Sequence, residues 1–277
     1  MSKPLNADKV SIHKKAALSK INSLLDEYIN DPEHLKKANL ISFWLENYIS
    51  YIQREETFNP SYLKRYERGD IIKVNFGFNV GSEYGGLHYA IVLDKYNARN
   101  SPVITVIPLT SYAEGDTIHP NDVSLGNELY LKLQLKIRGL KQNLSTERQQ
   151  TESLRSSIQT LLNILEPLLN EVASTDDVNK ITMNDEQSSA LEQAGRQLEL
   201  IQVHEENIQK QEILLNKASS ETAKMKDGSV ALPNQITTIS KQRIYDPKSS
   251  YDVLSGVKLS PDGLDKLNDG LKKLFFN

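Results

Sequence analysis

The spacing of apolar residues changes twice along this 277-residue chain, and the changes divide it into parts. Between about 127 and 226, apolar residues recur at alternating steps of three and four, which is the period of helices that pack along a seam. Residues 70–125 and 228–239 instead contain short β-branched runs bounded by turn residues, as strands do. A long helical segment therefore interrupts a β region.

Two apolar series make up the helical segment. The first contains Leu133, Ile137, Leu140, Leu144, Leu154, Ile158, Leu161, Leu165, Leu168 and Val172, and the second contains Leu191, Ala194, Leu198, Ile201, Ile208 and Leu215. Glu147 and Thr151 interrupt the first series, and Glu205 and Glu212 interrupt the second. The similar lengths of the series, and the polar link at 174–177, predict an antiparallel coiled-coil hairpin.

The remaining segments predict an α+β fold. Residues 70–76, 89–93 and 103–109 are short strands with tight turns between them, which favours an antiparallel barrel or meander. Residues 9–56 have helical spacing with a break at 31–32, and Ser260 and Pro261 predict the start of a C-terminal helix. We expect an N-terminal helical region (1–60), a β domain (61–126 with 228–277) and an inserted hairpin (127–227).

Composition excludes several kinds of site and location. The chain has no cysteine, so disulfides, thiolate nucleophiles and cysteine zinc sites are excluded. His13, His34, His119 and His204 show no mutual ligand spacing, and we expect neither a metal nor a cofactor. No segment has the apolar run of a signal peptide or a membrane span, so we expect a cytoplasmic protein without a membrane partner. The net charge of −3 still allows a local basic groove.

Three segments carry a resemblance to a known family. Residues 68–72 read Arg-Gly-Asp-Ile-Ile, and residues 81–88 read Gly-Ser-Glu-Tyr-Gly-Gly-Leu-His before a strand. Residues 234–244 read Asn-Gln-Ile-Thr-Thr-Ile-Ser-Lys-Gln-Arg-Ile, and residues 256–260 precede the last helix. In this order the segments resemble the opening strand, glycine loop and later strand of the MazF/PemK toxins.

The resemblance implies both a fold and an activity. The fold is a small SH3-like antiparallel β-barrel of the MazF/PemK/CcdB type, commonly a homodimer bound by a cognate antitoxin. The activity is sequence-selective cleavage of single-stranded RNA without a metal, through attack by the 2′-hydroxyl to give a 2′,3′-cyclic phosphate. The chain is therefore expected to be an endoribonuclease toxin of a toxin–antitoxin system.

The same resemblance implies three catalytic residues. His88 occupies the position of the family's arginine, and an imidazole can serve as acid or base where a guanidinium cannot. Thr110 matches the family's catalytic hydroxyl, and Glu83 in the glycine loop is a candidate base or a partner that orients His88. The alternatives are a packing histidine, a strand-end cap and a solvated turn carboxylate.

Five further residues are candidates for contact with RNA. They are Tyr84, for base stacking, and Ser111, Gln235, Lys241 and Arg243, for polar contact or phosphate binding. The alternative for the charged strand end is simple solvation.

Two other kinds of function fit the same features. One is a non-enzymatic toxin that uses this barrel to bind a protein target such as gyrase, because one fold supports several functions. The other is a structural assembly protein in which the coiled hairpin matters most and the barrel is vestigial. The glycine loop together with Thr110 favours the nuclease.

Overall fold

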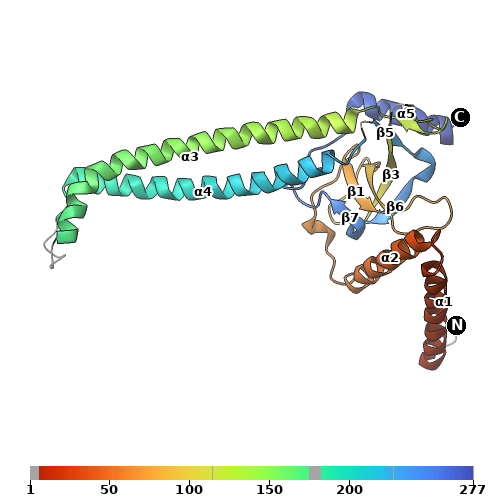
Figure 1. Cartoon of the computed structure of the whole chain (residues 1–277). Coiled ribbons are helices and arrows are strands. Elements are labelled where there is room, and N and C mark those ends of the chain that lie inside the picture. Colours follow the sequence, from red (N-terminus) through yellow and green to blue (C-terminus); the bar gives the residue numbers. More distant parts are fainter. Residues whose placement is uncertain (1–5, 114, 175–181, 227, 277) are drawn as a thin grey trace. The chain divides into compact units, whose positions relative to one another are not determined.

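The computed structural model describes residues 6–113, 115–174, 182–226 and 228–276. The chain forms two compact units (Figure 1), one of Met1–Leu109 with Leu232–Lys248 and one of Thr110–Ala231 with Ser249–Asn277. Among the described residues, no helix is both long and apolar enough to cross a membrane.

An antiparallel sheet forms the body of the first unit. Its strands are β1 (Ile71–Asn75), β2 (Leu87–Val92), β3 (Val103–Tyr112, in this unit as far as Leu109), β6 (Thr237–Ser240) and β7 (Ile244–Asp246). They pair in the order β6-β3-β2-β1-β7. Val74 lies opposite His88 and Ile91 lies opposite Ile107. Together with the helices below, this confirms the predicted α+β class.

The closed barrel that the resemblance implied is not found among the described strands. β6 and β7 are the two edge strands of this sheet, and η4 (Lys241–Arg243) joins them directly. In this 3₁₀ turn, the N–H of Ile244 bonds to the carbonyl of Lys241. The turn redirects the chain between its two strands, and the β1–β7 register shifts between Lys73 and Val74. The strand pairings therefore describe an open sheet.

Alternating apolar residues build the core of the first unit. The side chains of Ile72, Val74 and Phe76 are almost fully buried, as the two-residue period of a strand requires. The rest of this cluster comes from the neighbouring strands and from the segment before β1, namely Leu63, Tyr66, Ala90, Val92, Ile104, Val106, Ile239 and Ile244.

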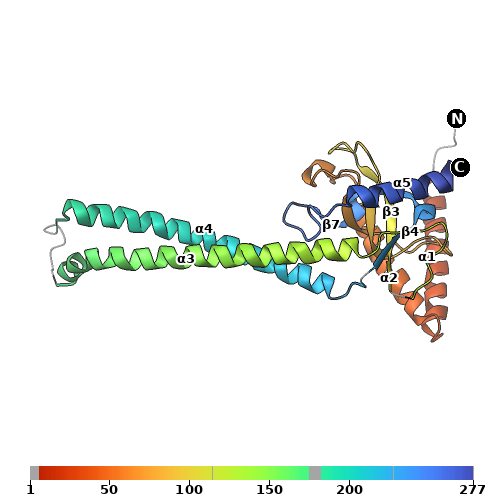
Figure 2. The ribbon, with the colours of Figure 1, turned by 90° about the horizontal axis from the view of Figure 1, so that it is seen from above.

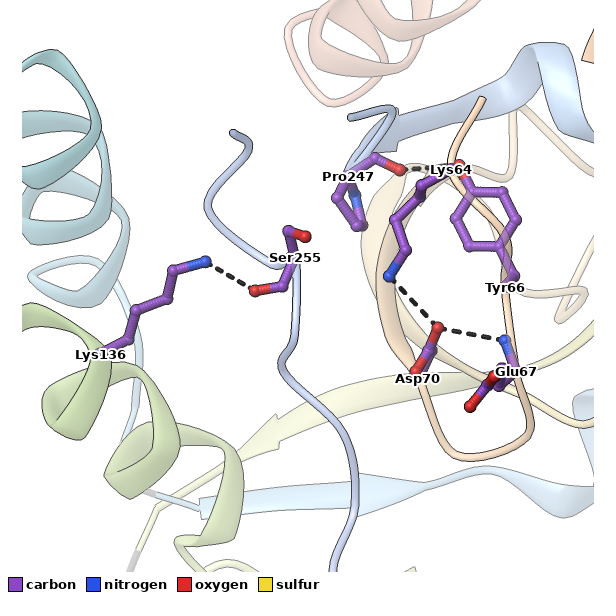
Figure 3. Close-up of polar contacts among 7 residues, drawn as sticks. All are labelled: Lys64, Tyr66, Glu67, Asp70, Lys136, Pro247 and Ser255. Carbon is purple, nitrogen blue, oxygen red and sulfur yellow. Dashed lines mark hydrogen bonds and ion pairs between the residues drawn. The ribbon is translucent and has the colours of Figure 1, made fainter. Parts of the chain in front are cut away.

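Polar contacts fasten the segment before β1 (Figure 3). The Tyr66 hydroxyl donates to the carbonyl of Pro247 at 2.7 Å, just beyond β7. Asp70 accepts from Lys64 at 3.3 Å and from the N–H of Glu67 at 3.1 Å. The Arg-Gly-Asp start of the strand thus serves the backbone here, since Arg68 also donates to the carbonyl of Leu93.

Two helices and a short turn precede this sheet. They are α1 (Ala7–Ile29), α2 (Leu35–Gln53) and η1 (Pro60–Tyr62). Asn6 caps α1 by accepting from the N–H of Asp8 at 2.8 Å. The helices break around Asp31, as the sequence predicted, and Asp31 bonds to His34 at 2.6 Å.

A long helical hairpin dominates the second unit. α3 (Glu128–Ser174) and α4 (Asp185–Thr222) run side by side in both views (Figures 1 and 2). The strands at their base, β4 (Val123–Ser124) and β5 (Gly228–Ala231), pair antiparallel. α5 (Pro261–Phe275) begins at the predicted Ser260 cap, whose hydroxyl accepts from the N–H of Gly263 at 3.1 Å. The chain thus leaves and re-enters this unit's strands at neighbouring positions.

The seam of α3 follows the predicted series. Leu144, Thr151, Leu161 and Leu165 are buried, and Glu147 is among the less exposed positions of the seam. Glu147 meets His204 of α4 through a short hydrogen bond between its carboxylate and the imidazole Nδ1. The polar interruption in the series is therefore paired across the seam.

The seam of α4 differs from the prediction. Ala190, Ala194 and Ile201 are buried, whereas Leu191 and Leu198 are 50% and 57% exposed. Glu205 and Glu212 lie outside the seam, where they pair with Arg155 and Arg148 at 2.6 Å each. The prediction is therefore confirmed at Ala194 and Ile201 and wrong at Leu191 and Leu198, and Ala190 is buried in place of Leu191.

Candidate functional site

The loop between β1 and β2 is held by its own backbone. The N–H of Gly86 donates to the carbonyl of Gly77 at 2.7 Å, and the Asn79 amide donates to the carbonyl of Tyr84 at 2.8 Å. A Cβ on Gly85 would lie 2.8 Å from the oxygen of Gly77, so this approach requires a glycine. The glycines of the motif therefore shape the loop that carries Glu83.

A polar cavity of about 370 Å³ lies beside this loop. Four of the predicted site residues line it: Glu83 and Tyr84 from the loop, Gln235 from η3 (Pro233–Gln235) and Arg243 from η4. About 150 residues separate the two contributing segments in sequence, as the Tyr84–Gln235 hydrogen bond shows. The fold of the first unit therefore gathers a carboxylate, an amide and a guanidinium around one space.

Gln235 clamps the glycine loop from the opposite wall. Its carbonyl oxygen accepts from the N–H of Tyr84 at 3.2 Å, and its amide donates to the carbonyl of Ser82 at 3.2 Å. Glu83 lies between Ser82 and Tyr84 in the sequence, and its carboxylate accepts from the N–H of Val80 at 3.3 Å. The carboxylate is thus held on a braced turn, which favours a defined position.

Arg243 is fixed by the end of β1 and by α2. Its Nε donates to the carbonyl of Asn75 at 2.8 Å, and its Nη2 donates to the carbonyl of Phe76. The Trp44 ring lies 5.3 Å from the guanidinium, in the range of a cation–π contact. Burial lowers the pKa of Arg243, and the neighbouring Tyr51 acts in the opposite direction. The guanidinium therefore has a fixed plane at the cavity wall.

His88 lies one contact away from the cavity. Its ring packs against Tyr84, with 4.7 Å between the ring centroids. Burial lowers the pKa of His88 below its usual 6.5, and the nearby Lys73 ammonium lowers it further. The imidazole is therefore mainly neutral at pH 7, and a neutral imidazole can accept a proton.

Two of the residues expected to bind RNA have internal roles. Tyr84 donates its hydroxyl to the carbonyl of Leu109 at 2.7 Å and packs edge-on against Phe76. Lys241 is only 1% exposed, and its ammonium donates to the carbonyls of Ala98 and Arg99 at 3.1 and 3.4 Å. The position of Lys241 contradicts a surface contact with phosphate, since its ammonium holds the 98–99 turn.

Thr110 and Ser111 continue β3 into the second unit. Thr110 is half-buried and Ser111 is exposed. The division of the chain falls immediately before Thr110, so these two residues are described with the second unit. The structure gathers Glu83, Tyr84, Gln235 and Arg243, with His88 beside them, in the first unit.

Trp44 and Asn75 support the site without a motif of their own. Gly77 has a positive φ of 84°, and a Cβ there would lie 2.7 Å from the Trp44 ring. The Asn75 amide donates to the Tyr51 hydroxyl at 3.3 Å. Aromatic side chains on α2 were one available signal, but helical spacing alone could not show which of them face the sheet. Within the described ranges, no three His, Asp or Glu side chains gather to hold a metal ion.

The first unit thus combines an antiparallel sheet, a braced glycine loop and a polar cavity. Residues 67–161 match the family described as PemK-like, MazF-like toxins of type II toxin–antitoxin systems. This match over residues 67–161 supports the family expected from the sequence. The match spans β1 to β4 and extends into α3. Compared with curated proteins, the chain has no significant match.

Proposed function

We propose that this protein is the toxin of a toxin–antitoxin system and acts as a sequence-selective endoribonuclease that cuts single-stranded RNA without a metal. The observation that carries the proposal is the cavity where Glu83, Gln235 and Arg243 meet beside His88. The glycine loop that forms part of it lies within the residues matched by the toxin family.

RNA supplies its own nucleophile, so the protein has three tasks. It takes the proton of the 2′-hydroxyl, stabilises the charge on the phosphorane and protonates the leaving 5′-oxygen. His88 is the first candidate for taking the proton, because burial and Lys73 lower its pKa and so favour the neutral imidazole, which can accept a proton; Glu83 is the second candidate. Arg243 is fixed at the cavity wall, where its positive charge would stabilise the phosphorane.

The remaining parts of the proposal rest on the family resemblance. Thr110 donates its hydroxyl to a phosphate oxygen, and Ser111 contacts RNA beside it. The partners are single-stranded RNA, a cognate antitoxin and a second copy of the chain, and the location is the cytoplasm. The helical hairpin is an insertion in a toxin domain of the MazF/PemK type.

The purified protein should cut single-stranded RNA in excess EDTA and leave 5′-hydroxyl and 2′,3′-cyclic phosphate ends. End-group analysis by mass spectrometry checks both products. Glu83→Gln is the matched variant, because it removes the charge while keeping the shape of the side chain. Cleavage only with added magnesium would contradict the mechanism. Intact RNA together with altered DNA supercoiling would instead indicate the binding toxin.

A further inference from the structure

A second cavity, of about 300 Å³, lies in the first unit and takes part of its lining from η4. Its lining contains the cationic residues Arg54, Lys241 and Lys248 and two aromatic residues, Phe58 and Tyr62. Within the described lining there is no Asp or Glu. In a chain of net charge −3, such a lining is a local concentration of positive charge.

Both walls of this cavity are braced. One wall begins at Arg54, whose carbonyl ends α2 and accepts from the N–H of Phe58 at 2.9 Å. The other wall includes Lys248, whose carbonyl accepts from the N–H of Lys64 at 2.8 Å. The hydrogen bond from Tyr66 to Pro247 fixes the preceding residue (Figure 3). The cavity is therefore formed by the fold rather than by loose side chains.

The lining suits a nucleotide of single-stranded RNA. Tyr62 is 84% exposed and offers a ring face for a base. Arg54 donates its Nε to the carbonyl of Ser50 at 3.0 Å, so the end of α2 holds its guanidinium in place, and Lys248 adds a second positive charge to the lining. The third cation, Lys241, is used inside the unit by the carbonyls of Ala98 and Arg99. Stacking combined with cationic contact is how proteins hold single strands without reading base edges.

η4 contributes consecutive residues to the linings of the two cavities. Gln242 lines the second cavity, and Arg243 lines the first. We propose that the second cavity binds a nucleotide flanking the bond that is cut, so that one RNA strand passes over η4 from one cavity to the other. The inference rests on the proposed ribonuclease function and adds to it an extended substrate site.

The test compares a long RNA with a short RNA that spans only the cleaved bond. Tyr62→Ala and Lys248→Gln should each raise KM for the long RNA about 10-fold, the scale of one lost stacked base. The value of kcat, and the KM for the short RNA, should stay unchanged. Lys248→Gln should also reduce the slope of log affinity against log salt by about 0.7.

A second exposed lysine–tyrosine pair provides matched controls. Tyr96 is 83% exposed, and the Lys95 ammonium lies 5.5 Å from its ring. Tyr96→Ala and Lys95→Gln should leave KM and salt dependence as in the wild type. Equal effects in both pairs, or unchanged KM in the Tyr62 and Lys248 variants, would overturn the second site.

A binding assay separates this inference from the proposed function. The wild type and the same four variants are titrated against fluorescently labelled long RNA, followed by anisotropy. If the wild type binds but does not cut, and the Tyr62 and Lys248 variants bind about 10-fold more weakly, RNA binding at the second cavity is confirmed and the proposed nuclease activity is wrong. If the wild type cuts and all variants bind equally, the nuclease activity is confirmed and RNA binding at the second cavity is wrong.

Discussion

Polar side chains enter both the sheet unit and the helical hairpin, but they are used differently in each. In the hairpin, Glu147 and His204 meet inside the seam and satisfy each other. In the sheet unit, Glu83 and Arg243 are held by main-chain groups and line a cavity. A polar group bonded to another side chain across a seam stabilises packing, whereas one braced by the backbone at a cavity is placed to meet a ligand.

The largest expected effect concerns His88 in the sheet unit. His88→Ala should reduce RNA cleavage by about 10²- to 10⁴-fold, the scale for a positioned proton-transfer group. Single-turnover kinetics measure the loss, and circular dichroism checks that the fold is kept. Full activity in this variant would move the chemistry to Glu83, Thr110 or another residue.

The pH dependence identifies the role of His88. Its pKa is lowered from 6.5, so a base at this position should give a rate that rises as pH passes through the lowered value and is flat above 6.5. The contribution of His88 to the free energy of unfolding is complete above pH 6.5 and is lost as the pH falls through the lowered pKa. His88→Arg should flatten the rate profile if only charge matters, and should stay impaired if a proton must move.

The next prediction tests whether Trp44 on α2 stabilises the sheet unit. Trp44→Ala removes the ring that packs on Gly77 and Arg243, and should lower the free energy of unfolding by about 2 kcal/mol. Chemical denaturation measures this loss. Phe43→Ala on the same helix is the control, because Phe43 is 57% exposed and should change stability little. Equal losses in both variants would mean that Trp44 acts only as a surface residue of α2.

A smaller effect is expected in the hairpin seam. His204→Ala leaves the Glu147 carboxylate without its partner across the seam, and should destabilise the hairpin by about 1 kcal/mol. Replacing both residues by leucine should restore or increase its stability, because apolar pairs often replace buried polar pairs without loss. Thermal melts of the helical signal measure both changes, and RNA cleavage should stay constant. A change in cleavage would show that the hairpin and the site are coupled.

The smallest effect on the sheet is expected from removing the hairpin. Replacing residues 130–224 by a short Gly/Ser linker should leave the strand signal in far-UV circular dichroism and remove most of the helical signal. Loop length affects closure entropy only weakly, so the strands tolerate either connection. Loss of the strand signal would show instead that the hairpin is needed for the β domain to fold.

Local patterns predicted the elements well. The strand at 70–76, the cap at Ser260 and most of the seam of α3 depend on neighbours in sequence, and the structure confirms them. In α4 the prediction holds at Ala194 and Ile201 but is wrong at Leu191, because Ala190 is the buried residue there. Which of two adjacent positions faces α3 depends on the partner helix and cannot be read from α4 alone.

The site could be predicted only in part for a similar reason. Motif residues located Glu83 and Arg243, because each lies next to turn residues that fix the chain. The burial of Lys241 depends on the 98–99 carbonyls, which are far from it in sequence. The contribution of Trp44 depends on the absence of a side chain at Gly77. Both are consequences of tertiary packing, as is the open edge between β6 and β7.

The pairing of β4 with β5 frees the hairpin from a constraint on its length. Val123 lies opposite Ala231, so the helices depart and return at adjacent points of one ladder. Seven residues added to each helix would advance the tip by about 10 Å and leave that ladder unchanged. The length of the helical hairpin can therefore change while β4 and β5 keep the same register.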